Sequence, residues 1–258
     1  LQGLRDVAHE LKDTTYHLGI FVDRTTKFGE RKAPTANDFL AKSRGEGLSL
    51  LARLSSSAAL LVTEDMPVAP YSSDLQELIK LIPSQTCEIQ AVDTTCIVPM
   101  QSTTRAYERA YEFRNSTAAV RTQVLSSLRE FQQLLQSPIV LTHHIPHTVS
   151  ATLSTLNNLP SSVLLNCDNE FISRLVDGCE GVDHSIPRTC ASIGGSVAGY
   201  QRWDAFASSG DGLRMYASQR NNILKPQGVS RMSAYHHFGM VSPFEIALQA
   251  KSQTKFIE

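Results

Sequence analysis

The sequence of 258 residues lacks the features that mark membrane proteins and disulfide-rich secreted proteins. No run reaches the roughly 18 apolar residues that a membrane helix needs, so we expect no membrane span. Its five cysteines are odd in number and none pairs with CxxC spacing, which argues against a disulfide framework and a zinc site. We therefore expect free thiols in a reducing compartment inside the cell, and the sequence leaves nucleus, chloroplast and cytoplasm open.

The sequence also lacks an excess of positive charge and the common phosphate-binding motifs. With 24 Lys and Arg against 25 Asp and Glu, the formal net charge is −1, which argues against binding nucleic acid over the whole surface. A local basic groove is still compatible with this value, because net charge averages over faces. No GxGxxG, P-loop or GxSxG sequence is present, so neither a dinucleotide fingerprint nor a nucleophile elbow is predicted.

The histidines do not form the pattern of a metal site. His143, His144 and His147 lie close together, but no further ligand of defined geometry accompanies them. His236 and His237 are adjacent, so on a helix they would point in different directions and could not form a zinc-binding pair. We therefore expect no metal site.

The first hundred residues do contain an alternation of helical and strand-like patterns within a composition of 41% hydrophobic residues, typical of a soluble globular protein. The predicted helices and strands alternate as residues 1–13, 17–23, 38–54, 58–63, 74–81 and 89–92. Ser72 or Ser73 would cap the third helix. This order predicts an α/β fold with a parallel, doubly wound, Rossmann-like sheet.

Acidic residues follow each predicted strand. Asp23, Glu64 and Asp93 stand just past the strand ends, which is where parallel sheets bind ligands. Strand-end capping and turn chemistry explain the same placement. The residues alone leave both interpretations open.

Helical patterns dominate after residue 104. The predicted helices are residues 104–135 with a break near Asn115, 169–176, 195–206, 212–220, and 233–249 with a break near Gly239. Between them, residues 137–166 are poor in charge and rich in Ser, Thr, Pro and Asn, as in an irregular linker. We predict an α/β domain over 1–136, an interdomain linker over 137–190 and a helical domain from 191 to 258. The single tryptophan, Trp203, is expected in a core.

Residues 212–244 contain the pattern with the most specific chemistry. A helix ends near Arg220, and a polar loop leads to the sequence Val229-Ser230-Arg231-Met232-Ser233 ahead of a new helix. Hydroxyl groups, an arginine and unpaired backbone amides at a helix N-terminus are suited to binding phosphate. An ordinary helix with serine as its N-cap fits the same residues, so both interpretations stand at this point.

This segment resembles the photolyase/cryptochrome family. The matching residues are Tyr216-Ala217, Arg220-Asn221, Val229-Ser230-Arg231-Met232-Ser233, Ala234-Tyr235, His237-Phe238-Gly239 and Val241-Ser242-Pro243. In that family a Tyr and an Arg on one helix precede a Thr-Ser-x-Leu-Ser loop, a Ser-(Pro/Ala)-Tyr-Leu-His-Phe-Gly run and Ile-Ser-Pro. Val229 replaces the usual Thr and removes one hydroxyl group, Met232 replaces Leu, and His236 stands where Leu is common.

Other stretches are similar to the class II branch of this family. Residues 194–216 resemble the run that opens the family's helical domain, and residues 91–99 resemble its Val-Asp-x-x-x-Ile-Val-Pro element. Residues 62–65 look like the class II strand that ends in Val-Thr-Asp, and residues 111–114 look like its Tyr-Ala-Ala-Arg helix. The resemblance spans most of the chain and is strongest over residues 194–245.

The resemblance implies a light-driven DNA repair enzyme, a carbon–carbon lyase that acts on UV-damaged DNA. Class II photolyases split cyclobutane pyrimidine dimers: photoexcited reduced FAD passes one electron to the dimer, two C–C bonds break and the electron returns. The lesion is flipped out of the duplex into a pocket over the flavin. An antenna chromophore of unknown identity would lie in the α/β domain, and a monomer is the default of the family.

Site residues follow from the matching positions. Tyr216 would line the FAD site, and Val229, Ser230, Arg231, Met232 and Ser233 would hold the pyrophosphate, chiefly through backbone amides and the two serine hydroxyls. Arg220 would contact the DNA backbone near the lesion. The catalytic residues and the electron-relay tryptophans would lie beyond residue 258.

The chain begins at Leu1 and ends without a stop signal, so we expect an internal part of a longer protein that binds FAD poorly alone. The alternative function is that of a cryptochrome-type photoreceptor or FAD-binding protein without repair activity, on the same fold. The departures at Val229, Met232 and His236 favour this alternative. A third interpretation, an unrelated α/β ligand-binding protein, predicts no flavin.

Overall fold

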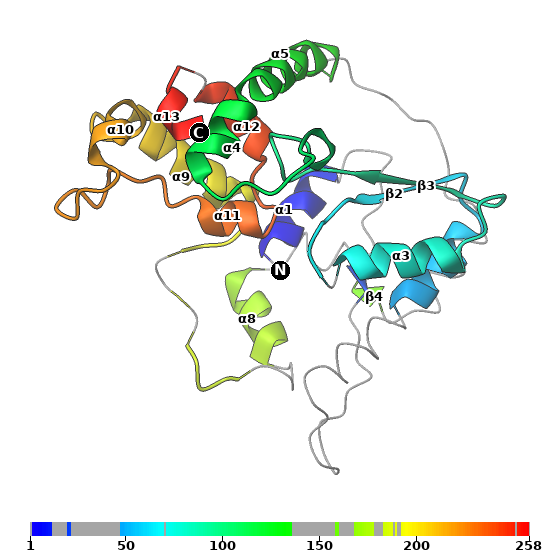
Figure 1. The fold of residues 1–258 in the computed structure, drawn as a ribbon. Coiled ribbons are helices and arrows are strands. Elements are labelled where there is room, and N and C mark those ends of the chain that lie inside the picture. The colour runs from blue at the N-terminus through cyan, green and yellow to red at the C-terminus, as the bar shows by residue number, and fades with distance from the viewer. Residues whose placement is uncertain are drawn as a thin grey trace. The chain divides into compact units, whose positions relative to one another are not determined.

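The computed structural model (Figure 1) shows a mixed α/β protein that is mostly helical, with a small two-stranded parallel sheet near the N-terminus. The structure describes residues 2–11, 20–21, 47–69, 71–135, 158–159, 168–177, 183–187, 189, 192–250 and 252–257. The chain divides into two compact units. The helical unit comprises Leu1–Val7, Thr95–Val140 and Cys190–Glu258, and the sheet unit comprises Ala8–Thr94 and Leu141–Thr189. The domain boundaries predicted at residues 136 and 190 stay a prediction.

The parallel sheet forms where the sequence predicts two of its strands. β2 (Leu60–Glu64) and β3 (Glu88–Val92) pair in parallel, with the first residues of the two strands opposite each other. α3 (Tyr71–Leu81) lies between them in the chain, because parallel neighbours need a crossover connection rather than a hairpin. The β-α-β order predicted for this stretch is confirmed.

A small apolar core supports the sheet unit. Its buried members are Leu48, Leu78, Ile82 and Cys87, and Ala52, Ala58, Leu61 and Ile89 pack against them. Leu78 and Ile82 are four residues apart and therefore project from the same side of the helix and its end. Leu61 and Ile89 are directly paired across the two strands, so one face of the sheet contributes to this core.

The first predicted strand pairs differently from the prediction. β1 (Ile20–Phe21) pairs antiparallel with β4 (Asn158–Leu159), whereas residues 17–23 were predicted to join the parallel sheet. An apolar run predicts an extended conformation but not its partner, because pairing depends on residues distant in sequence. Asp23, and most of the predicted helix at 38–54, lie outside the described residues, although residues 47–55 are helical.

The helical unit contains two longer helices, α5 (Ala118–Leu135) and α9 (Ser196–Ser208), and several short ones. Its other described elements are the first part of α1 (Gln2–Leu11), η1 (Met100–Ser102), α4 (Ala110–Ser116), η2 (Leu213–Met215), α10 (Tyr216–Gln219), α11 (Ser233–His237), α12 (Pro243–Gln249) and α13 (Thr254–Ile257). α8 (Asn169–Asp177) belongs to the sheet unit. The helices predicted at 1–13, 169–176 and 195–206 are confirmed, as is the break between α11 and α12.

Several helix limits differ from the prediction. α3 begins at Tyr71, so Ser72 and Ser73 lie inside its first turn rather than at its N-cap. α4 begins at Ala110 rather than at residue 104, and the predicted break falls at Thr117, whose hydroxyl donates to the Phe113 carbonyl at 2.7 Å. The helix predicted over 212–220 is a 3-10 turn followed by the single turn of α10. Helix limits depend on local hydrogen bonding, which apolar spacing does not record.

Aromatic side chains form the core of the helical unit. Its buried residues are Trp203, Phe206, Leu213, Met232, Tyr235, Val241, Ile246 and Ala250, and we call this set the tryptophan cluster. Trp203 is 0% exposed, and its indole Nε1 donates to Gln249 Oε1. Its ring centroid is 6.0 Å from that of Phe206 and 5.4 Å from that of Phe256. The expectation that Trp203 is a core residue is confirmed.

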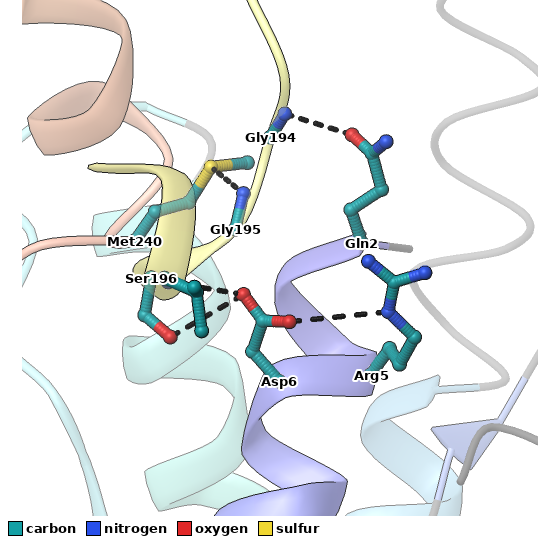
Figure 2. Close-up of polar contacts among 8 residues, drawn as sticks. Gln2, Arg5, Asp6, Gly194, Gly195, Ser196 and Met240 are labelled. Atoms are coloured by element: carbon teal, nitrogen blue, oxygen red, sulfur yellow. Dashed lines mark hydrogen bonds and ion pairs between the residues drawn. The ribbon is translucent and has the colours of Figure 1, made fainter. Parts of the chain in front are cut away.

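The N-terminal helix is fastened to the start of α9 (Figure 2). The Asp6 carboxylate accepts from the Val197 backbone N–H at 3.2 Å and from the Ser196 hydroxyl at 3.5 Å, so it caps α9 from another part of the chain. The Gln2 side-chain oxygen accepts from the Gly194 backbone N–H at 2.8 Å. Gly195 has a φ of 111° and a Cβ there would meet Asp6 Oδ2 at 2.2 Å, so this contact requires glycine.

Two expectations concern features that the structure describes only in part. No helix of the described residues is long and apolar enough to cross a membrane. Cys87 is buried and Cys96 half-buried, both with free thiols, whereas Cys167, Cys179 and Cys190 lie outside the described residues.

Candidate functional site

The predicted phosphate loop, Val229-Ser230-Arg231-Met232-Ser233, lies mostly outside regular secondary structure. Residues 229–232 form an irregular segment, and Ser233 is the first residue of α11. Arg231 has a φ of 56°, in the left-handed region that non-glycine residues rarely adopt. Met232 follows with φ −85° and ψ −7°. Consecutive residues of opposite handedness turn their amides toward one side, which makes a small anion-binding concavity.

The donors of this loop are not used by the protein itself. In the described part of the chain, no backbone amide of residues 229–232 donates to another group. The hydroxyl groups of Ser230, which is half-buried, and Ser233, which is exposed, also make no hydrogen bond there. Unused backbone donors normally find water or a ligand, so the loop can receive an anion without losing internal bonds.

Three contacts with neighbouring parts of the chain hold the loop in place. The Met232 side chain is 2% exposed and belongs to the tryptophan cluster, so it anchors the loop to the core. Arg202 Nε on α9 donates to the Ser230 carbonyl at 3.3 Å, and the Arg231 guanidinium donates to the Pro226 carbonyl at 3.3 Å. The Ser230 carbonyl is thus occupied, whereas the backbone amides of residues 229–232 remain available.

Tyr216 and Arg220 lie together on α10 and its end. The Tyr216 ring packs edge-on against Phe256 at 5.0 Å and against Phe206 at 6.4 Å, at the border of the tryptophan cluster. The Arg220 guanidinium carbon is 5.9 Å from the centroid of the Tyr216 ring, within the range of a cation–π contact. Because Met232 belongs to the same cluster, the structure brings Tyr216 and the phosphate loop to one core.

The expected helix N-terminus is weaker than the sequence suggests. The N-cap of α11 is Met232, with no side-chain cap, so neither serine of the loop caps this helix. The ordinary serine-capped helix considered for this segment is therefore wrong. α11 spans only five residues, so its dipole adds little, and the backbone amides of the loop are the relevant donors.

The histidines of this region have structural contacts. His236 Nδ1 lies 3.3 Å from the Val241 carbonyl, and the His237 ring lies 4.7 Å from the Phe238 ring. Gly239, with a φ of 63°, ends α11. No group of three or more metal-ligating side chains occurs among the described residues, and His143, His144 and His147 lie outside them.

A polar cluster that sequence reasoning missed links the turn segment, residues 220–228, to Gln219 and Asp211 through Lys225. Gln219 Nε2 donates to Asp211 Oδ1 at 3.2 Å, and Lys225 Nζ lies 3.5 Å from Asp211 Oδ2. The hydrogen bond from Gln219 and, next, the charge of Lys225 lower the pKa of Asp211 below its ordinary value of 3.8. Gln219 Oε1 is buried without a partner in the described structure. No spacing rule would have connected these three residues.

The surroundings of the loop are locally basic. Between residues 196 and 240 there are five Lys or Arg residues and two Asp residues, against a net charge of −1 for the whole chain. Within the described structure, four of the five make no ion pair: Arg202, Arg214, Arg220 and Arg231. The positive charge is therefore available to an anionic ligand.

The acids at the strand ends take part in local contacts. Glu64 ends β2, and its carboxylate accepts a hydrogen bond from the Thr94 hydroxyl. The Asp65 backbone N–H donates to the Val92 carbonyl at 2.8 Å, which extends the pairing of the two strands. These contacts support turn chemistry rather than ligand binding for Glu64.

No protein-family model, no curated protein and no solved structure matches this chain. The functional interpretation therefore depends on the residues of the phosphate loop and its surroundings.

Proposed function

We propose that the chain is part of a photolyase/cryptochrome-type flavoprotein and that the phosphate loop binds the diphosphate of FAD. The single observation that carries the proposal is the left-handed Arg231 in a loop with unused amides. A non-glycine residue in this conformation costs of order 1–3 kcal/mol, and such residues cluster at ligand-binding sites. The motif resemblance over residues 216–243 identifies the ligand class.

The residues present fit a diphosphate. The amides of residues 231–233 would bind one group of phosphate oxygens, and the hydroxyls of Ser230 and Ser233 would add two donors. Val229 has no hydroxyl to contribute, and the Met232 side chain is committed to the core, so Met232 would serve through its N–H. Tyr216 would line the site from α10. The bound flavin would supply the photochemistry, and these residues would position it and exclude water.

The activity we propose for the full-length protein is light-driven repair of cyclobutane pyrimidine dimers in DNA, a carbon–carbon lyase reaction. Arg220 is exposed and has no ion pair within the described structure, so it can contact a DNA phosphate near the lesion. The local excess of positive charge supports a nucleic-acid partner. A monomer and an antenna chromophore of unknown identity belong to the same proposal.

A cryptochrome-type photoreceptor without repair is the second candidate. The observation that favours it is the missing hydroxyl at Val229, because one phosphate contact of the repair enzymes is absent. Both candidates share the phosphate loop, so flavin binding is common to both proposals and only a repair assay separates the two functions.

The phosphate loop is tested by flavin retention. Ser230→Ala combined with Ser233→Ala should weaken FAD binding by the full-length protein about tenfold or more, because a hydrogen bond to a charged group contributes about 1.5–3 kcal/mol. The readout is flavin absorbance per protein after gel filtration. Ser218→Ala is the matched control, since its exposed hydroxyl donates only to the Met215 carbonyl. Unchanged flavin content in the double variant would refute the loop assignment.

Repair is tested with a dimer-containing oligonucleotide under blue light. The full-length protein should restore the paired thymines, and Arg220→Gln should weaken binding to DNA of any sequence while leaving flavin content unchanged. Flavin absorbance without repair would instead favour the photoreceptor. Absence of flavin in the full-length protein would favour an unrelated ligand-binding protein.

A further inference from the structure

Two apolar side chains at the tip of the turn segment are almost fully exposed. Ile223 is 93% exposed and Leu224 is 84% exposed, the highest values among the large hydrophobic residues of the described structure. At these exposures the two adjacent aliphatic side chains bury little surface against the part of the chain that the structure describes. Their exposure therefore needs an explanation from outside the fold.

The turn segment holds these side chains in place through a series of backbone turns. The amides of Asn222, Lys225 and Gly228 donate to the carbonyls three residues earlier at 2.8, 2.9 and 2.8 Å. The Leu224 amide also donates to the Asn222 side-chain oxygen at 3.0 Å. A Cβ at Gly228 would meet Gln219 Cβ at 2.9 Å, so the base of the segment packs closely against the end of α10. The tip is a defined projection.

Positive charges flank the apolar tip. Arg220 precedes it, and Lys225 follows it directly. The Arg231 guanidinium binds the Pro226 carbonyl at the base of the segment. Arg220 and Arg231 make no ion pair in the described structure, and Lys225 shares one with Asp211. An apolar pair between cations is suited to a surface where phosphates border exposed bases.

We infer that Ile223 and Leu224 form a wedge that inserts between bases of DNA at an opened or damaged pair, while Arg220 and Lys225 contact the neighbouring phosphates. This inference deepens the proposed repair function and depends on it for the choice of DNA. Proteins that unstack bases use one or two apolar side chains in this way, flanked by Arg or Lys. A stable protein–protein interface buries about 1,600 Å² in total, far more than two side chains supply.

The wedge is tested by DNA binding of the full-length protein. The probes are a duplex with two central unpaired thymines and the same duplex fully paired, compared by fluorescence anisotropy at one salt concentration. Ile223→Ser with Leu224→Ser should lower the preference for the unpaired duplex about tenfold, because the polar serine side chains do not fill the apolar space between the separated bases. Affinity for the paired duplex should change less than twofold. Ile223→Leu with Leu224→Met should keep the preference.

Two controls separate a wedge from general effects. Val197→Ser removes a 57% exposed apolar side chain from α9 and should leave both affinities unchanged. Arg220→Gln should weaken binding to both duplexes by similar factors. The slope of log affinity against log salt concentration should become smaller by about one, as expected for the loss of one phosphate contact. A preference for the unpaired duplex that survives the serine variant within twofold overturns the inference. Loss of self-association in that variant, with DNA binding intact, would assign the tip to a protein contact and overturn it equally.

Flavin content distinguishes this inference from the proposed function. If the serine variant keeps its flavin and repairs dimers at the wild-type rate, the flavoprotein proposal stands and the wedge is refuted. If the wild-type protein contains no flavin, and the serine variant loses the preference for unpaired thymines, the flavoprotein proposal is refuted and the wedge stands.

Discussion

The tryptophan cluster and the parallel two-stranded sheet differ in how far their apolar side chains are buried. In the cluster, Trp203 is 0% exposed and Met232 is 2% exposed, so nearly all of their apolar surface is withdrawn from water. In β2, Leu60 is 48% exposed and Val62 is 58% exposed, although residues 58–62 are all apolar. An apolar run thus indicates an extended strand, but burial depends on which elements cover each face.

The difference teaches where single substitutions will matter. Burial of apolar surface contributes about 25 cal/mol per Å², so side chains of the cluster carry stability that exposed strand residues do not. The close packing in the cluster also leaves no room for added atoms. Three predictions test this contrast.

The largest effect is expected for Trp203→Ala. Removing a fully buried aromatic side chain should lower the free energy of unfolding by about 3–5 kcal/mol, because a cavity remains and Gln249 loses its donor. Val62→Thr, which keeps the β-branched shape at an exposed position, should change it by less than about 0.5 kcal/mol. Urea titration followed by far-UV circular dichroism measures the free energy of unfolding of both variants. Equal losses of stability would contradict the difference between the cluster and the strand.

A smaller effect is expected where α9 approaches its neighbours. A Cβ at Gly199 would lie 2.4 Å from Val241 Cγ2 and 2.9 Å from Tyr235 Cδ1. Gly199→Ala should therefore destabilise the helical unit by about 1–3 kcal/mol through overpacking. Gly210→Ala is the control, because nothing lies within 4 Å of its Cβ. The fluorescence of the single tryptophan reports unfolding of this unit in both variants. An unchanged free energy of unfolding in Gly199→Ala would show that the neighbouring side chains can shift to accommodate the added methyl group.

The smallest effect concerns Asp211 in the solvent-exposed part of the helical unit. Its pKa is lowered in the folded state by the Gln219 hydrogen bond and the Lys225 charge, so the associated stability is present above the unfolded pKa. It is lost as the pH falls through the folded pKa, below the ordinary value of 3.8. Gln219→Ala and Lys225→Gln should each raise the pKa of Asp211 toward that value, because each removes a group that lowers it. Carboxyl NMR titration measures both shifts, and an unchanged pKa in either variant would contradict the assignment.

The sequence predicts the existence of most elements better than their partners. The apolar runs at 58–63 and 89–92 and the helical pattern at 74–81 predict the β-α-β order, because each of these patterns is local in the sequence. The antiparallel pairing of β1 with β4 was not predictable, because a two-residue strand has no periodicity and its partner lies far along the chain. The division of the helix predicted over 212–220 into a 3-10 turn and the single turn of α10 was not predictable for a similar reason, since one turn cannot establish a period.

The candidate site was predictable as residues and not as geometry. The motif resemblance identifies Ser230, Arg231 and Ser233, but only the structure shows that Arg231 is left-handed and that the amides are unused. The expected role of a helix N-terminus failed because α11 is five residues long. The cluster of Asp211, Gln219 and Lys225 joins three segments whose proximity is a tertiary result that no local pattern encodes.

The contact between Asp6 and the start of α9 can form only late in synthesis of the chain. The two partners are 191 residues apart in sequence, and a ribosome adds about 5–20 residues per second. The aspartate therefore leaves the ribosome on the order of 10–40 seconds before the amide of Val197 is synthesised. During that interval the first helix lacks the native contact that Asp6 makes with α9.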